Sequence, residues 1–373
     1  MKARTKLLML KGALTKKVPI YVQFAVSNRC NLRCSMCSAL DSRKAEQELG
    51  LPEIERLAGI LKELDVAILI LTGGEPLLRN DLAEIIRLFA RRGLEVRLQT
   101  NGILINESKV KELTDAGLKE VTISFDSFDA KKYDEITSVN GSWDKIIQGI
   151  ALFSQYLPKK GNISGINTVV SKKNIEEVPK LIEFATRIGF YISLIPVHIS
   201  GSNDKFIVRK DAPDFRFNTQ EYEVLDRIYA KIVEMKREGF NVYNSYRFLS
   251  ESKEFLKSGQ VNWHCDSPFL YFSISPAGNF LPCVDIPTSI SMLEDDFVQK
   301  FRSKEFINSI RDMVNKCSGC MYGCYPEVTY FCNDVKVFME RAMDGIRMQN
   351  SRRKPYEYNE LLGIIEEIKA KEA

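Results

Sequence analysis

Three closely spaced cysteines that follow an apolar run constrain this chain more than any other feature. Cys30, Cys34 and Cys37 come just after Tyr21 to Val26, a largely apolar run that predicts a buried strand. Spacings of three and then two residues let the three sulfur atoms turn inward from one loop, which suits an iron-sulfur cluster. No other Cys or His lies near in sequence to complete a closed zinc site. We therefore expect a cluster with one open iron, in a catalytic rather than a structural loop.

Length and composition are those of an ordinary globular protein. The 373 residues are enough for one large or two modest domains, and 45% of them are hydrophobic. No apolar run approaches the roughly 18 to 20 residues that cross a bilayer. The net charge of +4 is small, and the basic residues are spread among acidic ones. The sequence therefore gives no indication of nucleic-acid binding.

The basic segment at residues 1–19 is expected to lie outside the main fold. The first twenty residues contain six Lys and Arg residues and no acid. Their apolar part is too short and too often interrupted by Lys to be a signal peptide. A short amphipathic helix could rest on a membrane surface. The pattern favours a helix that caps the domain with its Lys side chains in water, so membrane contact is not expected.

Cysteine usage indicates a reducing compartment. The chain has nine cysteines, an odd number that full disulfide pairing would not satisfy. Thiols in such a chain point to metal or redox chemistry. We therefore expect a cytoplasmic protein.

Short apolar runs alternate with amphipathic segments after the cysteine loop, which predicts successive β-α units around a parallel sheet. The expected strands are Ile20–Val26, Ala67–Leu71, Glu95–Gln99, Glu120–Phe125, Ile163–Val170 and Tyr191–Pro196. The expected helices are Leu51–Leu64, Asp81–Arg92, Glu107–Ala116, Ser142–Tyr156 and Asn174–Ile188. Six such units make a partial (β/α)6 TIM-type barrel at residues 20–218, an α/β fold whose active site lies at the C-terminal ends of the strands. Residues 199–218 are expected to form a linker or lid loop.

Polar and glycine-rich segments follow these strands, as an active site at the strand ends requires. Gly73 and Gly74 follow the second strand, where two residues without a Cβ let the backbone approach a ligand closely. A tight β-α turn would explain them equally well. Thr100 follows the third strand, and Ser124 and Asp126 stand at the end of the fourth. Small polar side chains there can hydrogen-bond a ligand without filling the cavity.

The cysteine motif, Cys-x3-Cys-x-apolar-Cys with Met36 in the apolar slot, resembles that of radical S-adenosylmethionine (SAM) enzymes. The resemblance implies that Cys30, Cys34 and Cys37 bind a 4Fe-4S cluster whose open iron chelates the amino and carboxylate groups of SAM. It also implies that one electron from the reduced cluster splits SAM into methionine and a 5'-deoxyadenosyl radical. That radical would take a hydrogen atom from the substrate.

The later motifs fit the same resemblance and suggest a SAM pocket. Gly73-Gly74-Glu75-Pro76 is similar to the segment that binds the SAM amino group in this family. The other residues expected in the pocket are Thr100, Ser124, Asp126, Asn167, which could reach the carboxylate, and Ile195, where the adenine would rest. His198 follows the sixth strand and is either a proton carrier or a structural histidine, with the second favoured.

A second cysteine-rich region lies in residues 219–332. Cys265 and Cys283 bracket Phe269 to Phe280, which predicts a β-hairpin. Their Cys-x12-Gly-x4-Cys pattern resembles the SPASM/Twitch extension, which carries auxiliary 4Fe-4S clusters. The remaining thiols are Cys317, Cys320, Cys324 and Cys332, and their spacing departs from that of the family.

The number of auxiliary clusters is left open by these six thiols. We expect Cys265, Cys283, Cys317 and Cys320 to hold one cluster, with Cys324 and Cys332 spare. Alternatively, the last two help to form a second cluster that cysteines only partly ligate. A zinc site made by the last four cysteines is the structural alternative. Asp285 is a candidate catalytic base beside Cys283, or else a surface residue at a strand end.

The sequence therefore predicts a radical SAM enzyme with a C-terminal auxiliary cluster domain and a helical tail at residues 333–373. The resemblance implies a peptide, protein side chain or small metabolite as substrate, and a reducing partner such as flavodoxin or ferredoxin. A Twitch-type dehydrogenase of small molecules or an enzyme of cofactor or lipid biosynthesis is the main alternative. An iron-sulfur electron-transfer protein and a zinc-binding module are alternatives from other classes.

Overall fold

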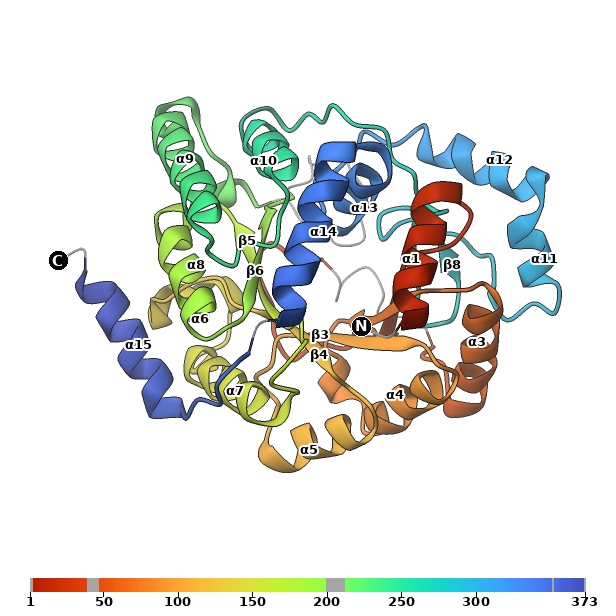
Figure 1. The fold of residues 1–373 in the computed structure, drawn as a ribbon, viewed down its shortest axis with the longest axis horizontal. Helices are drawn as coiled ribbons and strands as arrows, with labels where there is room; N and C mark the ends of the chain where they lie inside the picture. Colours follow the sequence, from red (N-terminus) through yellow and green to blue (C-terminus); the bar gives the residue numbers. More distant parts are fainter. Residues whose placement is uncertain (1–2, 39–46, 199–211, 351, 372–373) are drawn as a thin grey trace.

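The predicted partial barrel is present in the computed structural model of the chain, which describes residues 3–38, 47–198, 212–350 and 352–371 (Figure 1). An eight-stranded sheet has the order β6-β5-β4-β3-β2-β1-β7-β8. Its first six strands run parallel, each beside the next along the chain. Their bounds are β1 Tyr21–Ser27, β2 Ile68–Gly73, β3 Glu95–Thr100, β4 Glu120–Ser124, β5 Gly165–Val170 and β6 Tyr191–Pro196. The α/β fold expected from the sequence is therefore confirmed.

Side chains alternate between two environments along the strands. In β3, Val96 and Leu98 are buried beneath the helices that surround the sheet. Arg97 and Gln99 point to the other face, where they line a cavity inside the barrel. This alternation follows from the two-residue period of a strand. The apolar outer face holds the helices in place, and the inner face is free to carry polar groups.

Most barrel helices match the sequence prediction within two residues. The helices are α3 Leu51–Glu63, α4 Leu82–Arg91, α5 Glu107–Asp115, α6 Ala130–Thr137, α7 Ser142–Tyr156 and α8 Val178–Arg187. α8 is preceded by a short 3₁₀ turn, so the single helix predicted from Asn174 is divided. The sequence did not predict α6, which has eight residues and begins where the Asp129 side chain accepts a hydrogen bond from the backbone of Lys132.

The predicted hairpin is confirmed, but its place in the sheet is new. β7 (Tyr271–Ile274) and β8 (Phe280–Leu281) pair antiparallel. β7 also pairs parallel with β1, with Tyr21 opposite Tyr271. The cysteine-rich region therefore extends the barrel sheet itself. The sequence could not show this pairing because the two strands lie far apart along the chain.

The remaining helices cover the ends and the outside of the barrel. They are α1 Ala3–Thr15, α9 Tyr222–Glu238, α10 Tyr246–Ser258, α11 Phe297–Arg302, α12 Lys304–Val314, α13 Cys324–Asn333, α14 Val335–Asn350 and α15 Tyr358–Ala370. α1 and α14 lie in the foreground of Figure 1, and α15 packs against α7 and α8. The helical character predicted for the tail is confirmed.

The structure does not test two of the sequence predictions, the lid loop and the domain boundaries. Most of the predicted lid loop, residues 199–211, lies outside the described residues. The domain boundaries at 19, 218 and 332 stay predictions. Within the described residues, no helix is both long and apolar enough to cross a membrane.

Candidate active site

The first cysteine loop follows β1 and is held against the end of α6. The backbone N–H of Arg33 donates to Thr137 O at 3.0 Å, and that of Ser35 donates to Ile136 O at 3.2 Å. Burial raises the pKa of the Cys30 thiol to about 11, and neighbouring Glu75 and Cys37 add to the shift. Burial also raises the pKa of Cys34, again with a contribution from Cys37. The three sulfur atoms therefore lie within electrostatic reach of one another.

The donor set of this loop fits an iron-sulfur cluster. All three side chains are thiols, which are the usual ligands of such clusters. Leu32 N–H donates to Cys30 Sγ at 3.4 Å, a contact of the kind that tunes a cluster. The raised pKa values favour the protonated thiols, and the positive charge of bound iron would reverse this preference. Among the described residues, no three His, Cys, Asp or Glu side chains are grouped to hold a single metal ion.

The two glycines after β2 are required by the cysteine loop. Gly73 has a φ of +149°, and a Cβ there would lie 2.2 Å from Ser27 O. A Cβ on Gly74 would lie 2.1 Å from Arg29 O. Backbone hydrogen bonds accompany this contact, from Gly74 N–H to Ser27 O at 2.8 Å and from Glu75 N–H to Arg29 O at 2.7 Å. The sequence predicted a close approach to a ligand, and the structure shows close approach to the chain just before Cys30.

Glu75 is fully buried and its carboxylate is engaged by the chain itself. Its Oε1 accepts hydrogen bonds from the Thr100 hydroxyl at 2.6 Å and from Leu77 N–H at 2.9 Å. Its Oε2 accepts from Asn101 N–H at 2.8 Å. The Thr100 hydroxyl also accepts from Gly102 N–H at 2.9 Å. Glu75 and Thr100 thus tie the ends of β2 and β3 together, and their predicted contacts to SAM stay predictions.

Polar side chains from three neighbouring strands lie in register on the inner face. Ser124 of β4 is opposite Asn167 of β5, and Asn167 is opposite Ser193 of β6. Asp126 follows in the next turn, where its Oδ1 accepts a hydrogen bond from Val169 N–H at 2.7 Å. Burial raises the pKa of Asp126 to about 7. The charge of Asp126 contributes to the raised pKa of Cys34, so Asp126 lies near the first cysteine loop.

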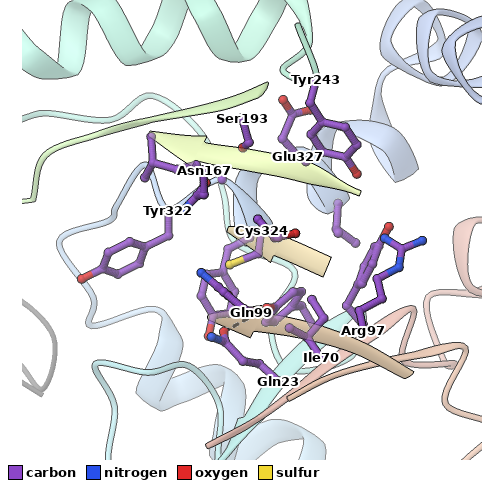
Figure 2. Close-up of a pocket in the computed structure, with 18 of the residues that line it drawn as sticks. Gln23, Ile70, Arg97, Gln99, Asn167, Ser193, Tyr243, Tyr322, Cys324 and Glu327 are labelled. Atoms are coloured by element: carbon purple, nitrogen blue, oxygen red, sulfur yellow. Dashed lines mark hydrogen bonds between the residues drawn. The ribbon is translucent and has the colours of Figure 1, made fainter. Parts of the chain in front are cut away.

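A cavity of about 300 Å³ fills the barrel interior (Figure 2). Arg97, Tyr243 and Glu327 lie at one end, and Tyr322 lies at the other. Six tyrosines take part in the lining: Tyr21, Tyr191, Tyr243, Tyr271, Tyr322 and Tyr325. The inward polar residues of the strands are Gln23, Gln99, Thr122, Asn167 and Ser193. The cavity is therefore aromatic with a few polar groups, as ligand sites commonly are.

The cysteine-rich region closes one wall of this cavity. Val284, Tyr322 and Cys324 line it together with Ile195 at the end of β6. A Cβ on Gly323 would lie 2.4 Å from Ile195 Cδ1, so glycine lets this region approach β6. Cys324 is the cysteine of this region that lines the cavity, next to Tyr322 and Gly323.

The nine cysteines all lie in described residues, and the six C-terminal ones have different surroundings. Cys283 lies close enough to Cys317 and Cys320 for their charges to raise its pKa, which burial raises most. Burial also raises the pKa of Cys265 most, and the charges of Cys283 and Cys317 raise it further. Cys324 interacts instead with the Tyr271 hydroxyl, and burial raises its pKa to about 11.

Cys332 lies near Asp266 and Lys16, and burial raises its pKa to about 12. Cys283 thus lies within electrostatic reach of Cys265, Cys317 and Cys320, the cysteines predicted with it for one auxiliary cluster. That cluster and the alternative zinc site both stay predictions.

His198 has a structural role in this arrangement. Its Nε2 accepts a hydrogen bond from Met321 N–H at 2.8 Å, and its ring stacks on Tyr322 at 4.1 Å. Tyr322 in turn donates through its hydroxyl to Asp285 Oδ1 at 3.4 Å. The Asp285 backbone N–H donates to Cys283 Sγ at 3.2 Å. Asp285 therefore lies against the cysteine cluster, and its role as a base stays a prediction.

Sequence reasoning missed the polar floor of the cavity. Arg97 Nε lies 2.7 Å from Glu120 Oε2, and Arg97 also contributes to the cavity wall. Polar residues within a strand of a buried parallel sheet are unusual, because such strands are normally almost wholly apolar. Arg97 and Gln99 in β3 were a signal that this face lines a site.

Comparison with known proteins identifies the domain that carries the first site. The profile of the Radical SAM superfamily matches residues 24–185. An AdoMet-dependent heme synthase of Methanosarcina barkeri is 28% identical over 324 residues, which cover 82% of this chain and 89% of that protein. A GTP 3',8-cyclase of Marinobacter nauticus is 39% identical over 181 residues, 47% of this chain and 53% of the cyclase. The chain thus spans about half the length of the cyclase it matches.

Solved structures share the fold over most of the chain. Streptococcus suis SuiB bound to the precursor peptide SuiA has a TM-score of 0.62 and 19% identity, over 89% of this chain and 77% of SuiB. The anSMEcpe structure with bound AdoMet and the Cp18Cys peptide has a TM-score of 0.57 and 15% identity, over 94% of this chain and 99% of that one. Enzymes of the matched family use SAM and a 4Fe-4S cluster. The chain is therefore an enzyme that carries a radical SAM domain at residues 24–185.

Proposed function

We propose that the protein removes a hydrogen atom from a substrate held in the barrel cavity, with an auxiliary iron-sulfur cluster at the cavity wall. When bound together, SAM and the reduced first cluster supply a carbon radical that can abstract hydrogen from an unactivated C–H bond. The observation that carries the proposal is the position of the cavity. It lies inside the barrel, between inward polar residues of the strands such as Gln99 and Asn167 and the wall built by Tyr322 and Cys324.

The first cluster would be held by Cys30, Cys34 and Cys37. The glycine pair after β2 sets the position of this loop, because the backbone contacts leave no room for a Cβ. SAM would lie along the strand ends that carry Ser124, Asp126 and Asn167, with Ile195 beside the adenine. Glu75 acts by holding two strand ends together, since both of its oxygen atoms are occupied.

One auxiliary cluster at Cys265, Cys283, Cys317 and Cys320 is supported by the mutual proximity of these thiols. Its position beside Val284 and Tyr322 would put it next to the substrate. In this place it would accept the unpaired electron of a substrate radical, which completes the oxidation, or help to bind the substrate. Asp285 lies at the same wall, where it would accept a proton released during an oxidation.

The size and lining of the cavity favour a compact substrate. About 300 Å³ is at the lower end of ligand-sized pockets and fits a side chain or a small metabolite better than a large macrocycle. The fold likeness to SuiB and anSMEcpe, both solved with peptides, supports a peptide side chain.

A second candidate is a step in cofactor synthesis. The matched heme synthase aligns with 82% of this chain. A tetrapyrrole-sized substrate would require the cavity to enlarge, so a shift of the aromatic wall on adding such a compound would favour this candidate.

Anaerobic reconstitution tests the proposal most directly. The protein should hold about eight irons if it has two clusters in all, and about twelve if it has three. Dithionite and SAM should then yield 5'-deoxyadenosine, and Cys34→Ala should abolish this product while the auxiliary iron remains. A physiological reductant such as flavodoxin or ferredoxin should replace dithionite.

Two other results would each point to another class of protein. Iron without SAM cleavage, in protein that binds no SAM, would indicate an electron-transfer protein. Stoichiometric zinc and no iron after anaerobic preparation would indicate a zinc-stabilised module.

A further inference from the structure

Two helices far apart in sequence each carry a stripe of exposed apolar side chains. Seven of the ten large hydrophobic residues exposed in the described part of the chain lie on α1 and α14. They are Leu7, Leu10 and Leu14 on α1, and Val335, Met339, Met343 and Ile346 on α14. Leu14 and Val335 are each 77% exposed. We call these seven residues the α1–α14 face.

Each helix buries one side and exposes a second apolar side. On α1 the exposed leucines are spaced by three and four residues, which aligns them on one side of the helix. Its buried residues, Leu8 and Gly12, lie on the opposite side. On α14 the four exposed residues are spaced by four, four and three, and Val337 and Met348 are buried opposite them. The buried sides of the two helices pack against the rest of the chain. The exposed apolar stripes are therefore available to contact another molecule.

The two helices border a second cavity. A smaller cavity of about 110 Å³ is lined by Met9 of α1 and by Arg341 and Asp344 of α14. It shares Tyr21 and Arg97 with the main cavity. Figure 1 shows both α1 and α14 in the foreground. The helices that carry the apolar stripes therefore also line a cavity next to the main one.

The charge around the stripes is basic. The first twenty residues hold six Lys and Arg residues and no acid. Lys6 and Lys11 are exposed on either side of the leucine stripe, and Lys336 and Arg347 are exposed beside the α14 stripe. Asp65 pairs with both Lys11 and Arg4, so one acid faces two bases at this end. The two acids on α14, Glu340 and Asp344, face inward to Lys236. Two copies of this face would repel each other, whereas an anionic surface would complement it.

We propose that the α1–α14 face docks the enzyme on an anionic lipid bilayer. Apolar stripes with flanking Lys and Arg are the pattern of helices that lie in a membrane interface. None of the seven side chains is among those that line the two cavities, so the stripes stand on the outer surface. Docking would set α1 and α14 against the membrane, which differs from the expectation that α1 only caps the fold.

Vesicle sedimentation with the reconstituted full chain tests this proposal. The protein should bind vesicles of equal phosphatidylglycerol and phosphatidylcholine, and should bind phosphatidylcholine alone at least about tenfold more weakly. Replacing two lysines should weaken binding to the anionic vesicles by about thirtyfold at low salt, since each basic residue near the surface adds a similar factor. That variant is Lys6→Gln with Lys11→Gln.

Matched apolar variants separate the face from general surface hydrophobicity. The test variant should lose vesicle binding and keep its iron content and thermal unfolding midpoint, because these side chains are exposed. It carries Leu7→Gln, Leu10→Gln, Leu14→Gln, Met339→Gln and Met343→Gln. The control variant makes the same change at exposed apolar positions elsewhere and should bind as the unmodified protein does. It carries Leu104→Gln and Met313→Gln.

Three outcomes would overturn the proposal. The first is absence of binding to the anionic vesicles. The second is equal loss of binding in the test and control variants. The third is concentration-dependent dimerisation that only the test variant abolishes, which would make the face an interface between copies. Because the readout is vesicle binding, a failure of SAM cleavage would leave this test unaffected.

Discussion

The carboxylate of Glu75 accepts a hydrogen bond from the hydroxyl of Thr100 at 2.6 Å, and this bond joins the ends of two neighbouring strands. The same carboxylate accepts from the backbone N–H groups of Leu77 and Asn101. Burial raises its pKa, and the three donors oppose that shift. The motif alone would assign Glu75 to SAM binding. In the structure, Glu75 joins the ends of β2 and β3 by hydrogen bonds.

Glu75→Gln should destabilise the protein by about 2 kcal/mol. The amide has one acceptor oxygen, so it cannot serve Leu77 N–H and Asn101 N–H from two sides, and one buried N–H loses its partner. Urea unfolding would measure the loss, and the KM for SAM should rise with it. The same change at exposed Glu223 should have little effect. Equal free energies of unfolding for the two variants would contradict the role of Glu75 in joining the strand ends.

Gly74→Ala should displace the cysteine loop and lower the iron content of the first cluster. The added Cβ would lie 2.1 Å from Arg29 O, and backbone atoms cannot yield as a flexible side chain does. Formation of 5'-deoxyadenosine should fall at least about a hundredfold, since a misplacement of about 1 Å can cost that much. Gly363→Ala in α15 is the matched control. A Cβ there meets nothing within 4 Å, so activity should be unchanged.

Removal of single cysteines should separate the auxiliary ligands from the spare thiols. Cys283→Ala should cost about four irons per chain, because Cys283 lies within electrostatic reach of the other three thiols predicted for the auxiliary cluster. Cys332→Ala should leave the iron count unchanged, since Cys332 lies near Asp266 and Lys16 instead. Iron and sulfide analysis after anaerobic reconstitution measures both variants. Loss of iron from the Cys332 variant would support a second auxiliary cluster.

Asp126→Asn should flatten the pH dependence of stability in the cluster-free protein. Burial raises the pKa of Asp126 from 3.8 to about 7, so between these values the folded state holds a proton that the unfolded state releases. The free energy of unfolding therefore falls as pH rises through this window and is level above it. The full effect is at most about 4 kcal/mol. The Asn oxygen can still accept from Val169 N–H.

Urea unfolding at pH 5 and pH 8 measures the Asp126 effect. The difference between the two pH values should shrink in Asp126→Asn and persist in Asp115→Asn, whose side chain is exposed. An unchanged difference in the first variant would show that Asp126 ionises normally in the fold.

The sequence by itself determined the barrel and the position of its motifs. Strand and helix periods are local properties, and the cysteine, glycine and polar segments follow their strands at spacings that can be read along the chain. Because parallel strands end at one edge of a barrel, Cys30, Glu75 and Asp126 could be assigned to one site before any contact was known.

Tertiary structure alone decided how distant segments share that site. The pairing of β7 with β1, the surroundings of Cys324 and Cys332, and the aromatic cavity all depend on contacts between residues far apart in sequence. The carboxylate of Glu75 likewise found its partners only when β2 and β3 lay side by side. Such contacts are set by packing and hydrogen-bond satisfaction across the whole fold, which no local pattern records.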